Sequence, residues 1–336
     1  MNMQSKSRQS KKNAGSGEPE RFEEIDKQFE KLLTEQRNPA SVDIDRKSVT
    51  EILEAINSED KKVPYAVEKE IPNIAEAVNL VVKSLETAGR LFYVGAGTSG
   101  RLGVLDASEC PPTFSTNPDL VQAIIAGGRE AVWRSIEGAE DDYQAGKKAI
   151  TDRNVCAKDV VIGLSASGGT QFVLAALEET KRIGAKTVAI STTPNSKIGR
   201  IADVAITPLV GPEVIAGSTR MKAGTAEKLV LNMISTASMI RIGKVYSNLM
   251  IDLKPVSEKL RSRARRILKV LTGVDSRKAH EAFERSGHDL KTALLMIKAD
   301  TSKRIARQAL KESSGIVWKA IELAKKLELD SRSNPH

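Results

Sequence analysis

Short apolar runs alternate with segments of helical periodicity through the middle of the chain. Glycine, serine or proline residues bound most of the runs, and the segments between them carry apolar residues three and four positions apart. The runs lie at 91–94, 121–126, 159–164, 187–191 and 204–208, and the expected helices between them include 101–106, 130–137, 141–151 and 171–183. Strands that alternate with helices form a parallel sheet covered on both faces. The pattern therefore predicts a doubly wound α/β domain over about 55–245.

Helical patterns also precede and follow the predicted sheet. Before it, three helices are expected. The first spans 22–33, the second begins after Ser48 as its N-cap residue, and the third spans 72–88. After it, a long apolar helix at 221–242 is expected to be buried or to lie at an interface. A strongly basic segment at 258–271 then follows, and after it come three short helices at 276–286, 289–298 and 301–310 and a last helix from about 314.

These patterns divide the chain into four predicted parts. Residues 1–20 are rich in Ser, Lys, Gly and Asn and predict a disordered tail. Residues 21–54 form an N-terminal helical segment, 55–245 the α/β domain, and 246–336 a C-terminal helical region. Hydrophobic residues make up 40% of the 336, which is enough to fill a sizeable core.

The charge is unevenly distributed. The formal net charge of +9 comes from 52 basic and 43 acidic residues. Residues 258–336 hold 19 of the basic and 10 of the acidic residues, so that the rest of the chain is balanced. This pattern favours a solvated basic helical face, and we expect no nucleic-acid partner, although a nucleic-acid-associated regulator stays an alternative.

Several classes of protein are disfavoured by what the sequence lacks. No apolar run reaches the roughly 18 residues of a transmembrane helix, and the N-terminus lacks the apolar core of a secretory signal. Cys110 and Cys156 are too few for a disulfide framework, and Cys/His metal-ligand spacings are absent. We therefore expect a soluble cytoplasmic protein without a membrane partner.

The distribution of histidine restricts the chemistry. His280, His288 and His336 are the only histidines, so the first 279 residues contain none. If the chemistry lies there, Ser-His-Asp and Cys-His arrangements are excluded. Carboxylates, Lys, Tyr or Cys must then act as acid and base.

Two glycine- and serine-rich loops each follow a predicted strand and open a helix. The first, at 95–100, matches GxGxxG, but no carboxylate ends the following strand as a dinucleotide site requires. Hydroxyls and backbone amides that converge near a helix N-terminus suit an anion such as a sugar phosphate. The alternative is two ordinary α/β turns. The candidate phosphate-binding residues are Gly97, Thr98, Ser99, Ser165, Ser167 and Thr170.

Longer motifs carry a family resemblance. Ser165-x-Ser-Gly-x-Thr170 resembles the phosphate loop of SIS (sugar isomerase) domains. The wider sequence resembles the N-acetylmuramic acid 6-phosphate etherases. The matching blocks are TEQRNP (34–39), VGAGTSGRLG (94–103), DASECPPT (106–113), IIAGG (124–128), EGAED (137–141), GPEVIAGSTRMKAGT (211–225), KLVLNMIST (228–236) and GKVY (243–246). One position departs from the pattern, because Gly169 stands where an arginine is common.

The resemblance implies a function. It implies an SIS-domain etherase that cleaves the D-lactyl ether of N-acetylmuramic acid 6-phosphate by elimination and hydration, in cell-wall amino sugar recycling. The products would be N-acetylglucosamine 6-phosphate and D-lactate. It implies a small-molecule substrate, a homodimer, and no metal or redox cofactor. The alternative is a non-catalytic sugar-phosphate-sensing regulator on the same fold, like the glucokinase regulatory proteins.

The resemblance also implies the catalytic residues. Glu109 matches a family active-site glutamate and is expected to donate the proton, and Glu140 is expected to be the second acid/base. Read without the family, Glu109 lies in an apolar Cys-Pro-Pro setting that favours a raised pKa. Glu140 alone reads equally as a charge at a helix N-terminus, beside Asp141.

Weaker candidates surround these residues. Glu213, Ser218, Thr219 and Lys222 enter the apolar helix at 221–242, where they either reach the substrate, across a dimer interface, or cap the helix. Glu35, Arg37 and Asn38 belong to the site or tie down the N-terminal helix. Cys110 has no histidine to activate it and is expected to be structural.

Overall fold

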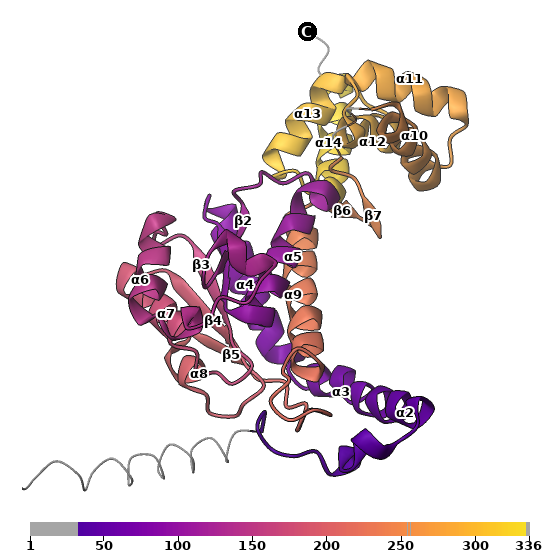
Figure 1. Cartoon of the computed structure of the whole chain (residues 1–336). Helices are drawn as coiled ribbons and strands as arrows, with labels where there is room; N and C mark the ends of the chain where they lie inside the picture. The colour runs from indigo at the N-terminus through magenta and orange to yellow at the C-terminus, as the bar shows by residue number, and fades with distance from the viewer. Residues whose placement is uncertain (1–32, 254, 256, 334–336) are drawn as a thin grey trace, which may run out of the picture.

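A computed structural model describes residues 33–253, 255 and 257–333 of the chain. The predicted tail at 1–20 lies outside the described residues, as does the predicted helix at 22–33 except for its last residue. Figure 1 shows the whole chain.

Five parallel strands form the central sheet, as the sequence predicts. They are β1 (Leu91–Gly95), β2 (Val121–Ile125), β3 (Val160–Leu164), β4 (Lys186–Ile190) and β5 (Val204–Ile206). Their order in the sheet is β2-β1-β3-β4-β5, and each pair is parallel. This is a doubly wound order in which the chain changes direction across the sheet between β1 and β3.

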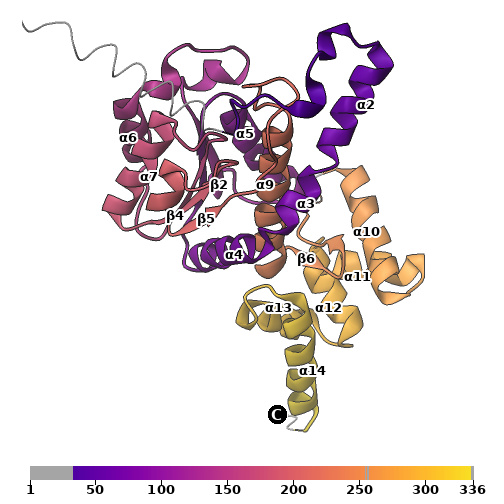
Figure 2. The same ribbon diagram turned by 90° about the horizontal axis from the view of Figure 1, so that it is seen from below.

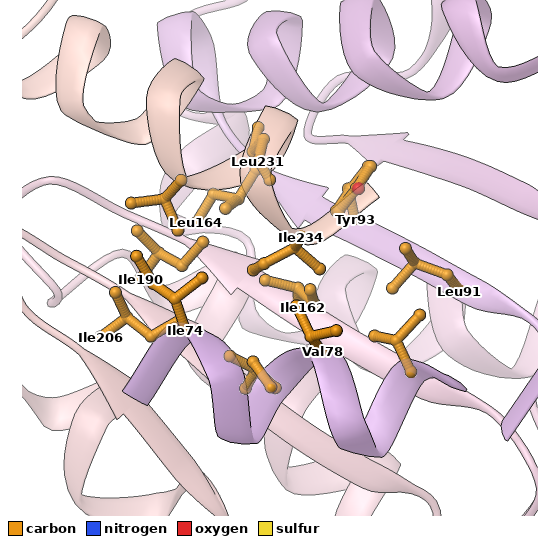
Figure 3. Close-up of a cluster of buried hydrophobic side chains, with 14 of the residues drawn as sticks. Ile74, Val78, Leu91, Tyr93, Ile162, Leu164, Ile190, Ile206, Leu231 and Ile234 are labelled. Carbon is orange, nitrogen blue, oxygen red and sulfur yellow. The ribbon is translucent and has the colours of Figure 1, made fainter. Parts of the chain in front are cut away.

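Helices cover both faces of the sheet. One face packs against α3 (Val63–Glu68), α4 (Ile71–Glu86), α5 (Gly97–Phe114) and α9 (Lys222–Arg241), and Figure 3 shows the cluster of apolar side chains between α4, α9 and the strands. The other face packs against α6 (Tyr143–Asp152), α7 (Gln171–Ile183) and α8 (Lys197–Ile201). Successive side chains of β1 point to opposite faces of the sheet. Tyr93 packs in the apolar cluster on the α4 and α9 side, and Phe92 packs in the cluster on the α6 and α7 side. Burial on both faces explains why the strands read as continuous apolar runs.

The N-terminal segment begins with two short 3-10 turns, η1 (Pro39–Ser41) and η2 (Ile44–Arg46), and continues into α2 (Val49–Asp60). Ser48 caps α2, as predicted. Its hydroxyl accepts a hydrogen bond from the Glu51 amide, and the Glu51 carboxylate accepts one from the Ser48 amide, which completes a capping box. Figure 2 shows α2 projecting from the α/β body.

The C-terminal helices have a hydrophobic cluster of their own. They are α10 (Glu258–Thr272), α11 (Ser276–Ser286), α12 (Leu290–Lys298), α13 (Lys303–Glu312) and α14 (Val317–Ser333). The last four were expected within a few residues, and α10 coincides with the segment described as strongly basic. A short antiparallel hairpin, β6 (Val245–Tyr246) and β7 (Leu249–Met250), joins them to α9. The basic residues of α10 are largely exposed, whereas its residues Ala264, Ile267 and Leu268 are buried. No helix in the described parts of the chain is both long and apolar enough to cross a membrane.

Two expectations about local structure were wrong, and three short elements were not expected. The helix after β1 does not end before Glu109 but continues through Pro111 and Pro112 to Phe114. Each proline removes one amide donor, and the helix ends two residues after the second of them. The helix expected at 130–137 is only the 3-10 turn η3 (Arg129–Val132), since its apolar residues Trp133 and Ile136 find no core and stay exposed. The short elements α3, α8 and the hairpin were not predicted.

The absence of a side chain at Gly146 allows α6 and α7 to pack with their backbones in contact. A Cβ at Gly146 in α6 would overlap the backbone carbonyl oxygen of Phe172 in α7. We therefore expect Gly146→Ala to lower the free energy of unfolding by about 1–3 kcal/mol, because a backbone atom has to move. Gly224→Ala in α9 is the matched control. Its Cβ would meet no atom closer than 3.4 Å, so the gain in helix propensity leaves stability equal or higher. Urea unfolding of the two variants measures the difference, and equal effects would contradict the packing argument.

Candidate active site

The two glycine-serine loops lie side by side because their strands pair. β1 and β3 are neighbours in register, with Gly95 opposite Leu164, so the loops after both strands leave the same edge of the sheet. The first loop turns tightly into α5, where a Cβ on Gly95 would lie 2.6 Å from the Gly100 amide nitrogen. Both loops line one cavity of about 790 Å³ at the carboxyl ends of the strands. This is the position and the size expected of a ligand site in a doubly wound sheet.

The second loop is held by its own hydroxyls. The Ser165 hydroxyl lies 2.8 Å from the Thr170 hydroxyl and accepts a hydrogen bond from the Gly168 amide at 3.0 Å. The Ser167 hydroxyl accepts one from the Gly169 amide at 3.3 Å. Gly168 has a φ of +67°, and a Cβ there would overlap that of Ser196, so only glycine fits. The loop thus presents a concentrated set of uncharged donors to the cavity.

The first loop contacts a buried carboxyl group that the sequence analysis missed. The Ser99 hydroxyl lies 2.8 Å from a carboxylate oxygen of Glu227, which is buried in α9. Ser99 lines the cavity together with Gly97 and Thr98. Burial raises the pKa of Glu227 to about 7, and the hydrogen bond with Ser99 only partly offsets this. No local signal in the sequence joins residues 99 and 227, because the contact depends on how α9 packs against α5.

Glu140 faces the same cavity as both loops. It lies in the 3-10 turn η4 (Ala139–Asp141), which Gly138 opens with a φ of +71°. The next helix, α6, is capped instead by Asp142, whose carboxylate accepts a hydrogen bond from the Ala145 amide at 2.8 Å. The capping role considered for Glu140 therefore falls to Asp142. Within the described residues, Glu140 and the six predicted loop residues come together at one cavity.

Glu109 does not lie at this cavity within one chain. It is exposed on α5, twelve residues beyond Gly97, which corresponds to about 18 Å along the helix axis. The apolar enclosure expected from Cys110-Pro-Pro is therefore absent around Glu109 in a single chain. Cys110 itself is buried, and burial next to Asp106 and Glu109 raises the pKa of its thiol to about 12. Such a thiol stays protonated, in agreement with the expected structural role.

Glu213 and Lys222 likewise lie away from the cavity and have partners within the protein. Glu213 caps α9, because its carboxylate accepts hydrogen bonds from the backbone amides of Lys222 at 3.0 Å and Ala223 at 2.9 Å. The Lys222 ammonium is 1% exposed and lies 2.6 Å from the Glu59 carboxylate of α2. Burial opposes the ionisation of Glu59, but hydrogen bonds from Lys222 and Lys62 outweigh it and lower its pKa to about 2. These contacts favour the capping and anchoring interpretation over substrate binding.

The N-terminal segment completes one wall of the cavity. Thr34 and Glu35 line it, together with Gly217 and Thr219, whereas Ser218 between them does not. The Thr34 carbonyl accepts a hydrogen bond from the Gly217 amide at 2.8 Å. The buried Thr34 hydroxyl has no partner among the described residues. An unpaired buried hydroxyl at a cavity wall is a candidate ligand contact.

Asn38 ties this segment down rather than lining the cavity. Its side chain amide donates a hydrogen bond to the Pro212 carbonyl at 3.0 Å, and its side chain oxygen caps η1. Arg37 is exposed and does not line the cavity. Of the three alternatives named with the TEQRNP block, only Glu35 is at the site, and Thr34 was missed although it begins that block.

The charged residues at the cavity are few. Its carboxylates are Glu35, Glu140 and Asp141, and its cations are Lys197 and Arg200 from α8. In the described part of the chain, no group of three or more His, Cys, Asp or Glu side chains is arranged to hold a metal ion. The site therefore offers hydroxyls, backbone amides, carboxylates and two cations for chemistry.

Comparisons with known proteins identify the family. Residues 73–181 match the model of the glucokinase regulatory protein N-terminal SIS domain, and residues 143–237 match that of the SIS domain. The N-acetylmuramic acid 6-phosphate etherase of Clostridium acetobutylicum is 54% identical over 298 residues, which cover 89% of this chain and 99% of that protein. The chain belongs to the N-acetylmuramic acid 6-phosphate etherase family.

A second curated relative agrees with this assignment. The etherase of Salinibacter ruber is 55% identical over 88% of this chain and 95% of its own length. Among solved structures, phosphoheptose isomerase GmhA from Neisseria gonorrhoeae superposes with a TM-score of 0.45 at 17% identity, over 57% of this chain and 98% of that chain. The predicted family, fold class and enzymatic nature are confirmed, and the non-catalytic regulator is not favoured. The individual roles of Glu109 and Glu140 stay predictions.

The burial of Glu227 predicts a pH dependence of stability. The unfolded chain loses this proton near pH 4.5, whereas the folded chain keeps it to about pH 7. The free energy of unfolding should therefore fall as the pH rises through this window, by roughly 3 kcal/mol in total. Glu227→Gln keeps a hydrogen-bonding side chain at Ser99 but cannot ionise. We expect this variant to gain stability relative to wild type between about pH 5 and pH 8 in urea unfolding.

The exposed residue Glu130 provides the control for this prediction. Glu130→Gln removes a carboxyl group from the surface turn η3, so its effect should change little across the same pH range. If Glu227→Gln changes the free energy of unfolding by the same amount at about pH 5 and at about pH 8, the carboxyl group of Glu227 is not neutral in the folded protein.

Proposed function

We propose that this chain cleaves the D-lactyl ether of N-acetylmuramic acid 6-phosphate by elimination followed by hydration. The observation that carries the proposal is one cavity, in a chain of this family, where two hydroxyl-rich loops meet the carboxylate of Glu140. The loops suit the phosphate, and the carboxylate suits proton transfer. The products are N-acetylglucosamine 6-phosphate and D-lactate.

The reaction requires two proton transfers in each half. In the open-chain sugar, the C1 aldehyde acidifies the C2 proton, and a carboxylate removes it. The C3–O bond then breaks, the C2–C3 double bond forms, and a carboxylic acid protonates the departing lactate oxygen. In the second half, water adds through its oxygen to C3 of the enone, one of its protons passes to a carboxylate, and C2 regains a proton. Two positioned carboxyl groups therefore serve the whole cycle.

The side chains of the site divide these tasks. Ser165, Ser167, Thr170 and the amides of their loop bind the phosphate, and Thr98 and Ser99 bind the sugar from the facing loop. The Thr34 hydroxyl, which has no partner among the described residues, donates a further hydrogen bond to the substrate. We assign the proton donor to Glu109 and the second acid/base to Glu140, as the family resemblance implies.

Glu109 takes part only if it belongs to a second copy of the chain. It lies on the exposed side of α5, about three turns beyond the cavity of its own chain. Leu105, one helical turn before it, is half exposed, as are Met233 and Ile240 on the adjacent α9. These three apolar side chains lie on neighbouring helices that Figure 1 shows at one edge of the α/β body. We infer a homodimer through the α5–α9 face in which Glu109 enters the partner's cavity.

The activity itself is tested by product analysis. Incubation with N-acetylmuramic acid 6-phosphate should release lactate and N-acetylglucosamine 6-phosphate, which mass spectrometry detects. In water enriched in heavy oxygen, the label should enter the C3 hydroxyl of the sugar, because elimination breaks the C3–O bond. Label in lactate would contradict elimination, and the absence of both products would refute the proposed function.

Mixed dimers test where Glu109 acts. Glu109→Gln and Glu140→Gln should each reduce kcat by about 10²–10⁴-fold, since each removes a proton-transfer group. When equal amounts of the two variants exchange subunits, each mixed dimer regains one intact site. Activity should then rise to about a quarter of the wild-type level.

The outcome distinguishes two arrangements. If both glutamates act within one chain, mixing restores nothing, because each chain lacks one of them. Size-exclusion chromatography of differently tagged chains establishes that subunits have exchanged, so that a failure to recover activity counts against the shared site.

A further inference from the structure

The second loop lacks a positive charge that its position would accommodate. By the family resemblance described above, an arginine is expected at the position of Gly169. A Cβ at Gly169 would meet nothing closer than the Ser167 hydroxyl at 3.8 Å, and its backbone is outside the left-handed region. A long side chain is therefore sterically possible there, and its absence is a property of this sequence rather than a requirement of the loop.

The cavity needs cations because of what it is proposed to bind. The substrate would bring a phosphate with a charge of about −1.5 to −2 and the carboxylate of its lactyl group. Glu35, Glu140 and Asp141 already line the cavity. Hydroxyls and amides supply only partial charges, so an anion beside three carboxylates requires a full positive charge nearby.

The segment before α8 is attached to the second loop. The Ile198 amide donates a hydrogen bond to the Gly168 carbonyl at 3.2 Å, and the Thr192 and Thr193 hydroxyls donate to the Ala166 carbonyl, each at 3.1 Å. The Ser196 hydroxyl caps α8 by accepting from the Gly199 amide at 3.1 Å. These bonds fix the start of α8 beside the loop assigned to the phosphate.

Two cations on α8 line the cavity. Lys197 and Arg200 both belong to its wall, and neither forms an ion pair within the described residues. Nearby cations differ. Arg182 pairs with Glu179 at 2.6 Å, and Lys181 donates a hydrogen bond to the Ile201 carbonyl at 2.7 Å. The charges of Lys197 and Arg200 thus remain available to a ligand.

We propose that Lys197 and Arg200 supply, from α8, the positive charge that binds the substrate phosphate in place of an arginine at position 169. The proposal rests on the proposed function for the identity of the ligand. It assigns the two side chains to phosphate binding and not to proton transfer. Binding measurements therefore test it separately from turnover.

The test compares ligands that carry one anionic group each. Calorimetry measures the affinity for N-acetylglucosamine 6-phosphate, which lacks the lactyl group, and for N-acetylmuramic acid, which lacks the phosphate. Lys197→Ala/Arg200→Ala should weaken binding of the phosphorylated ligand by about 10- to 100-fold. Binding of N-acetylmuramic acid should stay within about twofold, and KM should rise far more than kcat falls.

A compensating substitution sharpens the test. Gly169→Arg in the Lys197→Ala/Arg200→Ala background should restore at least about tenfold of the lost affinity, because it returns a bidentate donor to the same phosphate. Arg277→Ala/Lys278→Ala, on the exposed face of α11, is the matched control that removes equal charge far from the cavity. It should leave both affinities unchanged.

Three results would overturn the proposal. They are unchanged affinity for the phosphorylated ligand in the Lys197→Ala/Arg200→Ala variant, a loss confined to N-acetylmuramic acid, and an equal loss for both ligands. The second would assign the cations to the lactyl carboxylate, and the third would indicate a structural defect. A wild-type chain that binds the phosphorylated sugar but releases no lactate would refute only the proposed function.

Discussion

The pairing of β1 with β3 is the constraint on which the site depends. These strands are consecutive neighbours in the sheet but not in the sequence, and their crossover connections cover opposite faces. The two loops therefore diverge from one point and leave a cavity between them. The register of β1 against β3 fixes the relative position of the two loops, because a shift by one residue would turn Tyr93 and Phe92 to the wrong faces of the sheet. The apolar runs that build the core thus also fix where the hydroxyls of both loops meet.

Helix α9 connects this cavity with the rest of the molecule through buried charges. Glu213 holds its first amides, and Lys222 joins it to Glu59 of α2. One turn further, Glu227 contacts Ser99 of the first loop. A buried ion pair adds little net stability compared with apolar packing, but losing one partner is costly. Each of these contacts therefore ties the position of α9 to a polar partner whose loss would leave a buried group unpaired.

The sequence predicted those features whose signals are local. Strand runs, the Ser48 capping box and the loops at 95–100 and 165–170 each depend on neighbouring residues, and the structure has them where expected. The positions of Glu109 and Lys222 relative to the cavity were harder to predict. That of Glu109 depends on the path of α5, and that of Lys222 depends on Glu59, a partner 163 residues away. Glu227 and the unpaired Thr34 hydroxyl carry no signal of their own, since a buried polar atom is recognised only once its surroundings are packed. Family motifs indicate that such residues matter without indicating what they touch.

The net charge of the chain says little about how an anion is bound. The excess of positive charge lies beyond residue 257, and α10 exposes much of it on a surface formed by other helices. At the cavity the balance is reversed, with three carboxylates against two cations. Repulsion between these carboxylates and an anionic ligand weakens binding, so cations are useful where they face the anionic group of the ligand. In the proposed site, Lys197 and Arg200 of α8 lie beside the second loop and so meet this requirement.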